Sequence, residues 1–317
     1  MAGPLSHSKL CEIEDFSHPD LLPVMRDVLS PFLTEHPDYP VGMEHRKSWE
    51  IVMTARAFRD FGALHAQSEV LGVGAGREVT LFWLTNHVKR VFATDLYLTE
   101  DEWSAGDSGS QIVRDPRPLW GGEWNPGRLV AQHMNGLELQ YEDDSFDAVF
   151  SSSSIEHFGT FGDVRRSVEE MYRVLKPGGV LALATEYRLE GPPPGVPGTN
   201  IFSEAELRDL LLRGFDWELQ GPLDLGYGDA SLALELTLDD ILAADEAGTP
   251  AFPAILLRLG GHLWTSVHVT LVKSGSPAPV KPGSGRRIRR RETTNKLFAQ
   301  PRRIRNIPAY IRDRRSR

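Results

Sequence analysis

A short apolar run that breaks into alternating glycines is the feature that most constrains how this chain can fold. The run is Val70–Val73, and Gly72, Gly74 and Gly76 alternate across its end. This order is expected where a buried strand turns sharply into a helix beneath a bound nucleotide. Glycine accepts a positive φ and lets the backbone approach a ligand, and the amides at the helix start face whatever lies above the turn. We therefore predict a ligand site built largely from backbone at this turn.

A second apolar run supplies a carboxylate at the end of the next strand. Val91–Thr94 leads into Asp95, which follows Gly74 by 21 residues. A carboxylate at this position can accept hydrogen bonds from both hydroxyls of a ribose. The pattern is not a dinucleotide fingerprint, because its third glycine would fall where Arg77 stands. It is not a P-loop either, because no Gly-Lys-Ser/Thr follows the turn.

Two later stretches carry further motifs. Residues 133–158 contain Asn135-Gly136, a turn of the form D-x-S-F-D, an apolar strand ending in Ser151-Ser152, and then Ile155-Glu156-His157. Residues 173–179 read R-V-L-K-P-G-G and precede another apolar run, Val180–Thr185. Together with the glycine turn, these residues resemble class I S-adenosylmethionine (SAM)-dependent methyltransferases of the type 11 kind. The run S-S-S-S-I-E-H-F-G resembles the glycan-linked members of that group, and the resemblance spans roughly residues 43–272.

The resemblance implies a fold and a cofactor. The fold would be α/β, a Rossmann-like seven-stranded methyltransferase sheet in three α/β/α layers, and the cofactor would be SAM. In that family the glycine turn passes under the methionine part of the cofactor, and the acidic residue holds the ribose. Many members have Asp where this chain has Asn135, whose side-chain oxygen can still accept from the adenine amino group while the next amide donates to a ring nitrogen. The implied cofactor-binding residues are Gly72, Gly74, Gly76, Asp95, Asn135, Gly136, Ser151 and Ser152.

Methyl transfer from a sulfonium depends mainly on alignment, although a hydroxyl acceptor also needs a proton acceptor. His157 is the first catalytic candidate, because an imidazole titrates near neutrality and the residue follows the fourth strand near the expected cleft. Its alternative is a structural role, with Glu156, at a helix start. Glu186, expected just past the fifth strand, is the second candidate and Tyr187 the third. No metal site is predicted, since the chain has neither an H-E-x-x-H motif nor paired cysteines.

The segment before the glycine turn predicts an amphipathic helix over residues 43–61. Its apolar residues recur near the helical period and form one face: Trp49, Val52, Met53, Ala57 and Phe61. The first turn of this helix carries Arg46, Lys47 and Glu50. Either these charges form a solvated turn, or, as the family resemblance implies, they reach the amino acid end of the cofactor.

The chain divides into three parts. Residues 1–44 are expected to form an N-terminal cap, 45–273 the methyltransferase domain with insertions at 96–129 and 221–261, and 274–317 a basic, flexible tail. The first insertion is too irregular for a helix and too aromatic for a disordered linker, so it is either a lid or acceptor wall, or a surface insertion pinned by its tryptophans. Residues 186–199 predict a proline/glycine loop. Further helices are expected at 21–33, 163–175 and 203–212, and strands at 215–219 and 263–272.

Charge is distributed very unevenly. The whole chain carries −9 and residues 286–317 carry +11, which leaves −20 on the remaining 285 residues. The tail suits an anionic membrane surface, a nucleic acid, or the protein's own acidic body. Cys11 is the sole cysteine and no stretch of 18 uncharged apolar residues occurs, so we expect a reducing, cytoplasmic setting, with the tail available for contact at the inner membrane surface.

These observations lead to one expected function and two alternatives. We expect SAM-dependent methylation of a hydroxyl on a small acceptor, and the group resemblance implies a sugar or glycan-related metabolite. One alternative is a SAM-fold enzyme of different chemistry. The other is a catalytically silent SAM-binding module that the basic tail recruits to a membrane or a nucleic acid. The residues leave the acceptor and the oligomeric state open.

Overall fold

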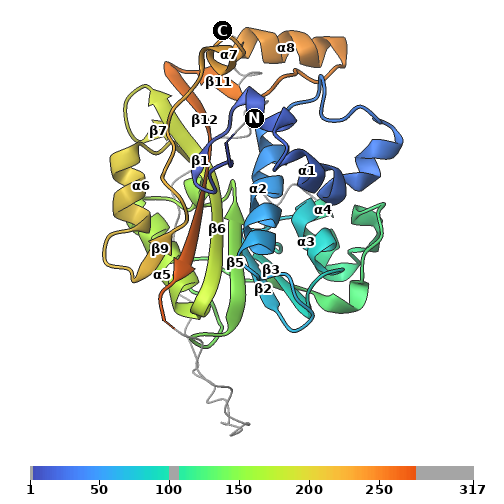
Figure 1. Cartoon of the computed structure of the whole chain (residues 1–317), viewed down its shortest axis with the longest axis vertical. Coiled ribbons are helices and arrows are strands. Elements are labelled where there is room, and N and C mark those ends of the chain that lie inside the picture. Colours follow the sequence, from blue (N-terminus) through green and yellow to red (C-terminus); the bar gives the residue numbers. More distant parts are fainter. Residues whose placement is uncertain (1–2, 100–106, 276–317) are drawn as a thin grey trace, which may run out of the picture.

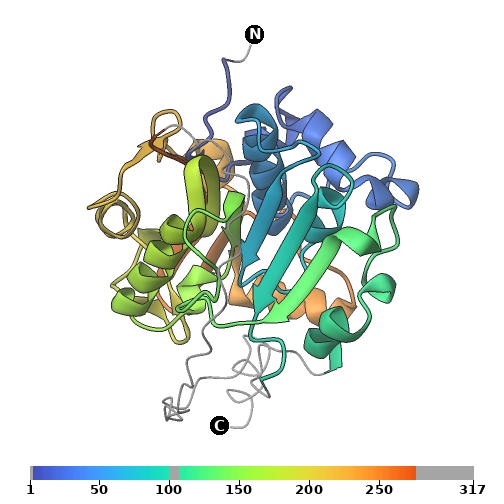
Figure 2. The same cartoon turned by 90° about the horizontal axis from the view of Figure 1, so that it is seen from below.

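A mixed β-sheet runs through the middle of the computed structural model, which describes residues 3–99 and 107–275 (Figures 1 and 2). Within these residues the sheet has ten strands, and its main path is β10-β11-β12-β6-β5-β2-β3-β4. Seven of the strands form the predicted methyltransferase sheet: β2 (Glu69–Val73), β3 (Arg90–Asp95), β4 (Leu129–His133), β5 (Phe146–Ser152), β6 (Leu175–Glu190), β9 (Trp217–Leu219) and β12 (His262–Lys273). The first five are parallel, and β12 is antiparallel to both β6 and β9. The carboxyl ends of the five parallel strands therefore meet at one edge of the sheet, as a nucleotide site requires.

Three additional strands widen this sheet. β1 (Lys9–Leu10) pairs antiparallel with β12, so the N-terminal region contributes to the sheet as well as covering it. β10 (Glu235–Thr237) and β11 (Leu256–Leu259) come from the second insertion, together with helices α7 (Asp229–Leu232) and α8 (Leu238–Ala247). A separate two-stranded hairpin pairs β7 (Gly195–Val196) with β8 (Thr199–Asn200). This hairpin and the second insertion both follow strands of the central sheet.

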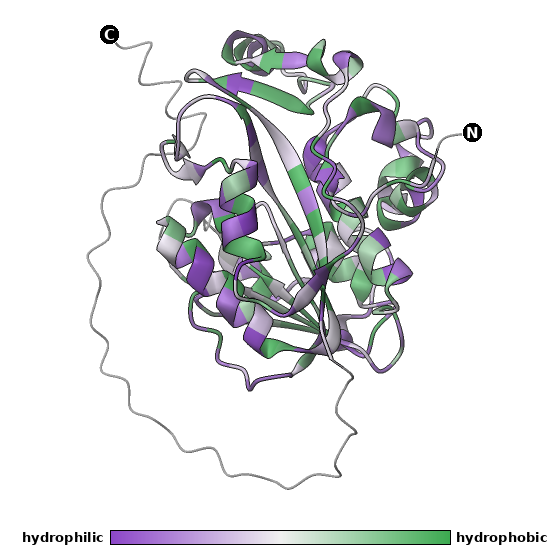
Figure 3. Ribbon diagram, turned by 60° about the vertical axis from the view of Figure 1, so that its left-hand side comes forward, coloured by the Kyte–Doolittle hydropathy of each residue, from purple (hydrophilic) through white to green (hydrophobic). Residues whose placement is uncertain are grey.

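Helices cover both faces of the sheet, which confirms the predicted three layers (Figure 1). One face packs against α1 (Leu22–Val28), α2 (Arg46–Asp60) and α3 (Val79–Leu84), and the other against α5 (Phe161–Val174) and α6 (Glu204–Leu211). Hydrophobic and hydrophilic residues alternate along these flanking helices (Figure 3). Among the described residues, no helix has both the length and the apolar character needed to cross a membrane.

Capping residues in the sequence explain where helices α5 and α6 begin. Thr160 accepts from the Asp163 amide, and the Asp163 carboxylate accepts from the Thr160 amide, which is a capping box at the start of α5. Ser203 and Glu206 form the same arrangement at the start of α6. The helices predicted at 163–175 and 203–212 are therefore confirmed, with small differences at their ends.

Three local predictions were wrong. The loop expected at 186–199 begins later, because β6 continues to Glu190 and its residues pair with β12, for example Glu186 with Ser266. The first insertion does contain a helix, α4 (Asp107–Arg114), which packs on β4 because Ile112 is buried. The solvated first turn of α2 is wrong as well, since Arg46 and Glu50 are only 8% and 1% exposed.

The described part of the first insertion is anchored by its tryptophans. The Trp120 ring stacks on Phe82 of α3 with centroids 6.1 Å apart, and Trp124 meets the same ring edge-on at 5.0 Å. These contacts favour the surface insertion over the lid. Trp103, and the basic tail at 286–317 for which membrane or polyanion contact was predicted, lie outside the described residues.

Candidate active site

The glycine turn after β2 can exist only without side chains. Gly74 and Gly76 have φ values of +63° and +48°, a region that L-residues rarely adopt. A Cβ on Gly74 would lie 2.6 Å from the Cβ of Ser154 and 3.0 Å from the Phe158 ring. A Cβ on Gly72 would lie 2.7 Å from the Phe150 ring. The turn is therefore packed closely from below, and its backbone remains the surface that a ligand would meet.

Asp95, at the end of β3, is joined to this turn. Its Oδ2 accepts from the Gly76 amide at 2.9 Å and its Oδ1 from the Leu96 amide at 2.6 Å. Burial raises the pKa of Asp95, and the two amides act in the opposite direction. Each carboxylate oxygen has a second lone pair, so the group can also accept from a pair of hydroxyls. The structure thus brings together the two halves of the predicted nucleotide site.

Asn135 and Gly136 follow β4 and lie beside the same turn. The Asn135 side-chain oxygen accepts from the Leu137 amide at 3.0 Å, which fixes the loop. A Cβ on Gly136 would lie 3.0 Å from Cγ1 of Val73 and 3.1 Å from the Phe158 ring. Gly136 therefore packs directly on the strand that carries the glycines.

Ser151 and Ser152 are buried at the carboxyl end of β5, as predicted. Within the described part of the chain, the Ser151 hydroxyl has no hydrogen-bond partner. Buried polar atoms without partners are rare in folded proteins. A hydroxyl without a partner, near the glycine turn and the Asp95 carboxylate, fits a nucleoside ligand.

A buried charge cluster lies where α2 begins. Nη1 of Arg46 donates to both oxygens of Glu186 at 2.7 and 2.6 Å, and Nζ of Lys47 lies 2.8 Å from the same carboxylate and 3.0 Å from Glu50. The Ser153 hydroxyl bonds to both Lys47 and Glu50. Burial alone would raise the pKa of Glu186, but Arg46 and Lys47 outweigh it and lower that pKa to about 2. Glu186 is therefore a carboxylate at any physiological pH.

The turn after β5 carries His157 to the edge of a cavity of about 360 Å³. The cavity is lined by Glu156, His157, Gly159 and residues 194–200, which include the β7–β8 hairpin. Nδ1 of His157 lies 2.9 Å from the Gly198 carbonyl oxygen. Nδ2 of Asn200 donates to the carbonyls of Glu156 and Gly159 at 3.1 and 2.9 Å. The hairpin therefore holds this turn in place and closes one side of the cavity.

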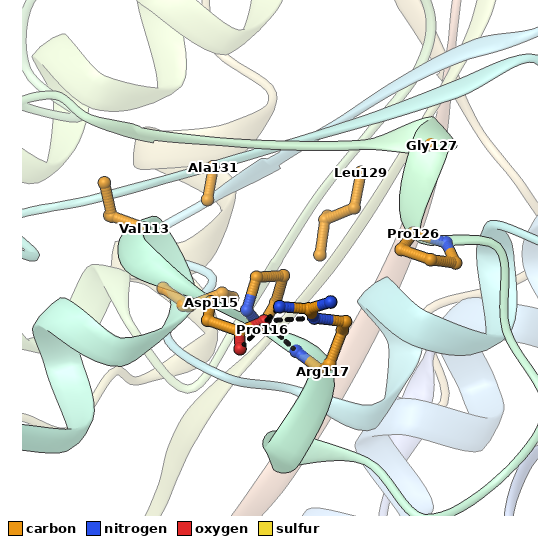
Figure 4. A pocket seen from close by; sticks show the side chains of 9 residues that line it. Val113, Asp115, Pro116, Arg117, Pro126, Gly127, Leu129 and Ala131 are labelled. Atoms are coloured by element: carbon orange, nitrogen blue, oxygen red, sulfur yellow. Dashed lines mark hydrogen bonds and ion pairs between the residues drawn. The ribbon is translucent and has the colours of Figure 1, made fainter.

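A second cavity, of about 480 Å³, lies beside β4 (Figure 4). Leu129 and Ala131 of β4 line it together with Val113, and an ion pair of 2.7 Å joins Asp115 and Arg117 at its side. None of the predicted site residues belongs to its lining. It is therefore separate from the glycine turn.

The sheet order, the glycine turn and the carboxylate at the end of β3 together match the class I methyltransferase architecture. Residues 71–183 match the sequence model of a family described as a methyltransferase domain. Residues 71–183 accordingly belong to a methyltransferase domain of the class I SAM-dependent kind, for which SAM is the cofactor.

The chain is similar to several individual proteins. It is 25% identical over 164 residues to the O-methyltransferase resE of Aspergillus sclerotiorum, a match that covers 51% of this chain and 56% of that protein. Among solved structures, the [4+2]-cyclase SpnF matches with a TM-score of 0.45 and 17% identity, over 81% of this chain and 97% of its own. A SAM-dependent methyltransferase from Mesorhizobium loti matches with a TM-score of 0.41 and 16% identity, over 69% and 97%. The chain thus spans little more than half the length of the curated relative.

Proposed function

We propose that this protein transfers the methyl group of SAM to a hydroxyl oxygen of a small acceptor. The observation that carries the proposal is one continuous arrangement: the glycine turn is bonded to Ser154, and the turn that Ser154 begins also lines the 360 Å³ cavity. A pocket of this size beside a cofactor site suits a small molecule. The O-methyltransferase relative supports oxygen as the acceptor atom.

The cofactor residues in this proposal are those that the sequence indicated. Gly72, Gly74 and Gly76 shape the backbone under the cofactor, and Asp95 accepts from the ribose hydroxyls. The adenine-side contacts fall to Asn135 and Gly136, and Ser151 and Ser152 lie beneath. When bound, SAM supplies a methyl group already activated by its positively charged sulfur. The chain's own contribution is then to hold the acceptor in line and to exclude water.

His157 and Glu186 keep roles in this proposal, but different ones. His157 lines the cavity and contacts the acceptor. Glu186 is ion-paired to Arg46 and Lys47 and has a lowered pKa, so it acts by positioning these two cations rather than by taking a proton. Lys47, whose side chain is 34% exposed, is the cation of the cluster that a cofactor carboxylate can reach.

A sugar or glycan-related acceptor is the finer part of the proposal. The residues that line the cavity include His157, Thr199 and Asn200, which carry hydrogen-bonding groups, and Val196 and Pro197, which are apolar. A sugar presents the same combination, because hydroxyls surround its apolar C–H faces. This supports a polyhydroxylated acceptor.

The test is transfer of labelled methyl from SAM by the full chain. A panel of monosaccharides and glycosides is compared with simple phenols, and label in product is measured together with S-adenosylhomocysteine. We expect label in a hydroxylated acceptor, and label in a sugar would support the finer proposal. Binding of SAM in calorimetry without transfer to any hydroxyl would refute the proposed hydroxyl methylation and favour a silent binding module.

A further inference from the structure

Glu156 is a buried carboxyl whose side chain the proposed function has not yet used. It is 1% exposed, and its Oε2 accepts from the Thr185 hydroxyl at 2.8 Å. Its other oxygen, Oε1, is equally buried and has no hydrogen-bond partner among the residues that the structure describes. A carboxyl oxygen left unpaired in the interior is costly. It therefore indicates a partner beyond the described residues, and a bound acceptor would supply one.

The position of Glu156 shows where that partner would be. Ser154 lies at the start of the turn that carries Glu156, and its hydroxyl donates to the Gly74 carbonyl at 2.5 Å. Nδ2 of Asn200, on the hairpin, donates to the Glu156 carbonyl. Glu156 itself lines the 360 Å³ cavity. The residue thus lies between the cofactor turn and the space that we assign to the acceptor.

Burial, together with two neighbouring carboxylates, makes this carboxyl a stronger base than an ordinary glutamate. Burial, and then the negative charges of Glu186 on β6 and Glu50 on α2, raise the pKa of Glu156 to about 8, while Lys47 on α2 opposes them. Arg46 on α2 also faces the group, and His157 adjoins it on the same turn. Two neighbouring carboxyls, Glu156 and Glu186, thus have pKa values displaced in opposite directions. Such pairs commonly mark the groups that exchange protons in an active site.

We propose that Glu156 accepts the proton of the acceptor hydroxyl during methyl transfer, an inference that rests on the function proposed above. The O–H bond breaks and its proton passes to Oε1 of Glu156. The electron pair stays on the acceptor oxygen, which forms the new bond to the methyl carbon, while the electrons of the broken C–S bond remain on sulfur. The acceptor group is therefore a neutral hydroxyl, because a carboxylate needs no base and would be repelled by ionised Glu156.

The first experiment compares Glu156→Gln with His157→Asn and with a control, Glu218→Gln, at an exposed position on β9. Acceptor turnover is measured against pH at saturating SAM. In the wild type we expect the rate to rise as pH passes about 8, and in E156Q we expect kcat to fall about 10²- to 10⁴-fold with this rise abolished. H157N should raise KM and keep the pH dependence, and E218Q should match the wild type.

The second experiment measures the carboxyl without turnover. Infrared spectra of the protein alone should show the band of a protonated carboxyl that disappears as pH is raised through about 8 and is absent from E156Q. Calorimetry should give E156Q an unchanged affinity for SAM, which shows that the variant is folded. Near wild-type turnover in E156Q, or loss of the pH dependence in H157N alone, would overturn the inference. Those results leave the proposed function intact, whereas absence of wild-type transfer to any hydroxyl overturns both.

Discussion

Replacing Glu186 by Gln should destabilise the protein strongly. The carboxylate is 4% exposed and is held by Arg46 at 2.6 Å and Lys47 at 2.8 Å. Gln keeps the shape of the side chain but removes the charge that compensates two cations, of which Arg46 is buried. An uncompensated buried charge is among the few single changes that cost several kcal/mol.

Two arguments give the same magnitude for this loss. The pKa of Glu186 falls from an ordinary 4.5 to about 2, and at 1.36 kcal/mol for each pKa unit this corresponds to about 3 kcal/mol at neutral pH. Removing one partner of a buried ion pair typically costs about 3–5 kcal/mol. We therefore expect E186Q to lose about 3 kcal/mol of unfolding free energy at pH 7.

The assay is urea-induced unfolding of the wild type, E186Q and a control, Asp209→Asn. Asp209 pairs with Arg213 on the surface, where the side chains are 52% and 81% exposed, so D209N should cost less than about 1 kcal/mol. The stabilisation from a lowered carboxyl pKa is complete above the unfolded value of 4.5 and disappears as pH falls through about 2. The E186Q deficit should therefore shrink to about half by pH 3. A deficit under 1 kcal/mol at pH 7, or one that grows on acidification, would refute the reasoning.

Three further predictions concern Gly74 of the glycine turn, Asp95 and Glu156. Gly74→Ala should weaken SAM binding at least tenfold in calorimetry, because its Cβ would meet Ser154. Gly62 also has a positive φ but lies in open space, so the control Gly62→Ala should bind SAM normally. Equal affinities of the two variants would contradict the assignment of the glycine turn to the cofactor site. Asp95→Ala should weaken SAM binding by about 10- to 100-fold, since hydrogen bonds to a charged group contribute about 1.5–3 kcal/mol, and an unchanged Kd would exclude it as the ribose ligand. The raised pKa of Glu156 gives the folded state an advantage that is present below pH 4.5 and lost as pH rises to about 8, so wild-type Tm should fall relative to E156Q over this range; parallel curves would show that the carboxyl titrates normally.

The glycine turn and the carboxylate after the next strand were predictable because their signals are local. A glycine that requires positive φ, such as Gly74, and an apolar run that ends in a carboxylate, such as Asp95, each express their structure within a few residues. The helix start at Ser203 is equally local, because its capping partner Glu206 lies three residues away. Sheet order followed from the family resemblance and not from any of these patterns.

The charge cluster was not predictable in the same way. Arg46 and Glu186 are 140 residues apart, and a charged residue at a helix start is solvated in most proteins. One signal was available, since Arg46, Trp49, Glu50 and Met53 continue a single helical stripe at spacings of three and four. The extent of β6 to Glu190 was missed for a related reason, because those residues are held by pairing with the distant strand β12.

The second insertion is hydrogen-bonded to the start of α2. The Arg46 amide donates to the Ala254 carbonyl at 3.0 Å, and the Ala254 amide donates to the Glu44 carbonyl at 2.8 Å. The segment that returns from the insertion therefore fixes the backbone of the turn that carries the cluster. Because Lys47 and Glu50 lie in that turn and both shift the pKa of Glu156, the insertion and the proton acceptor are connected through one helix end.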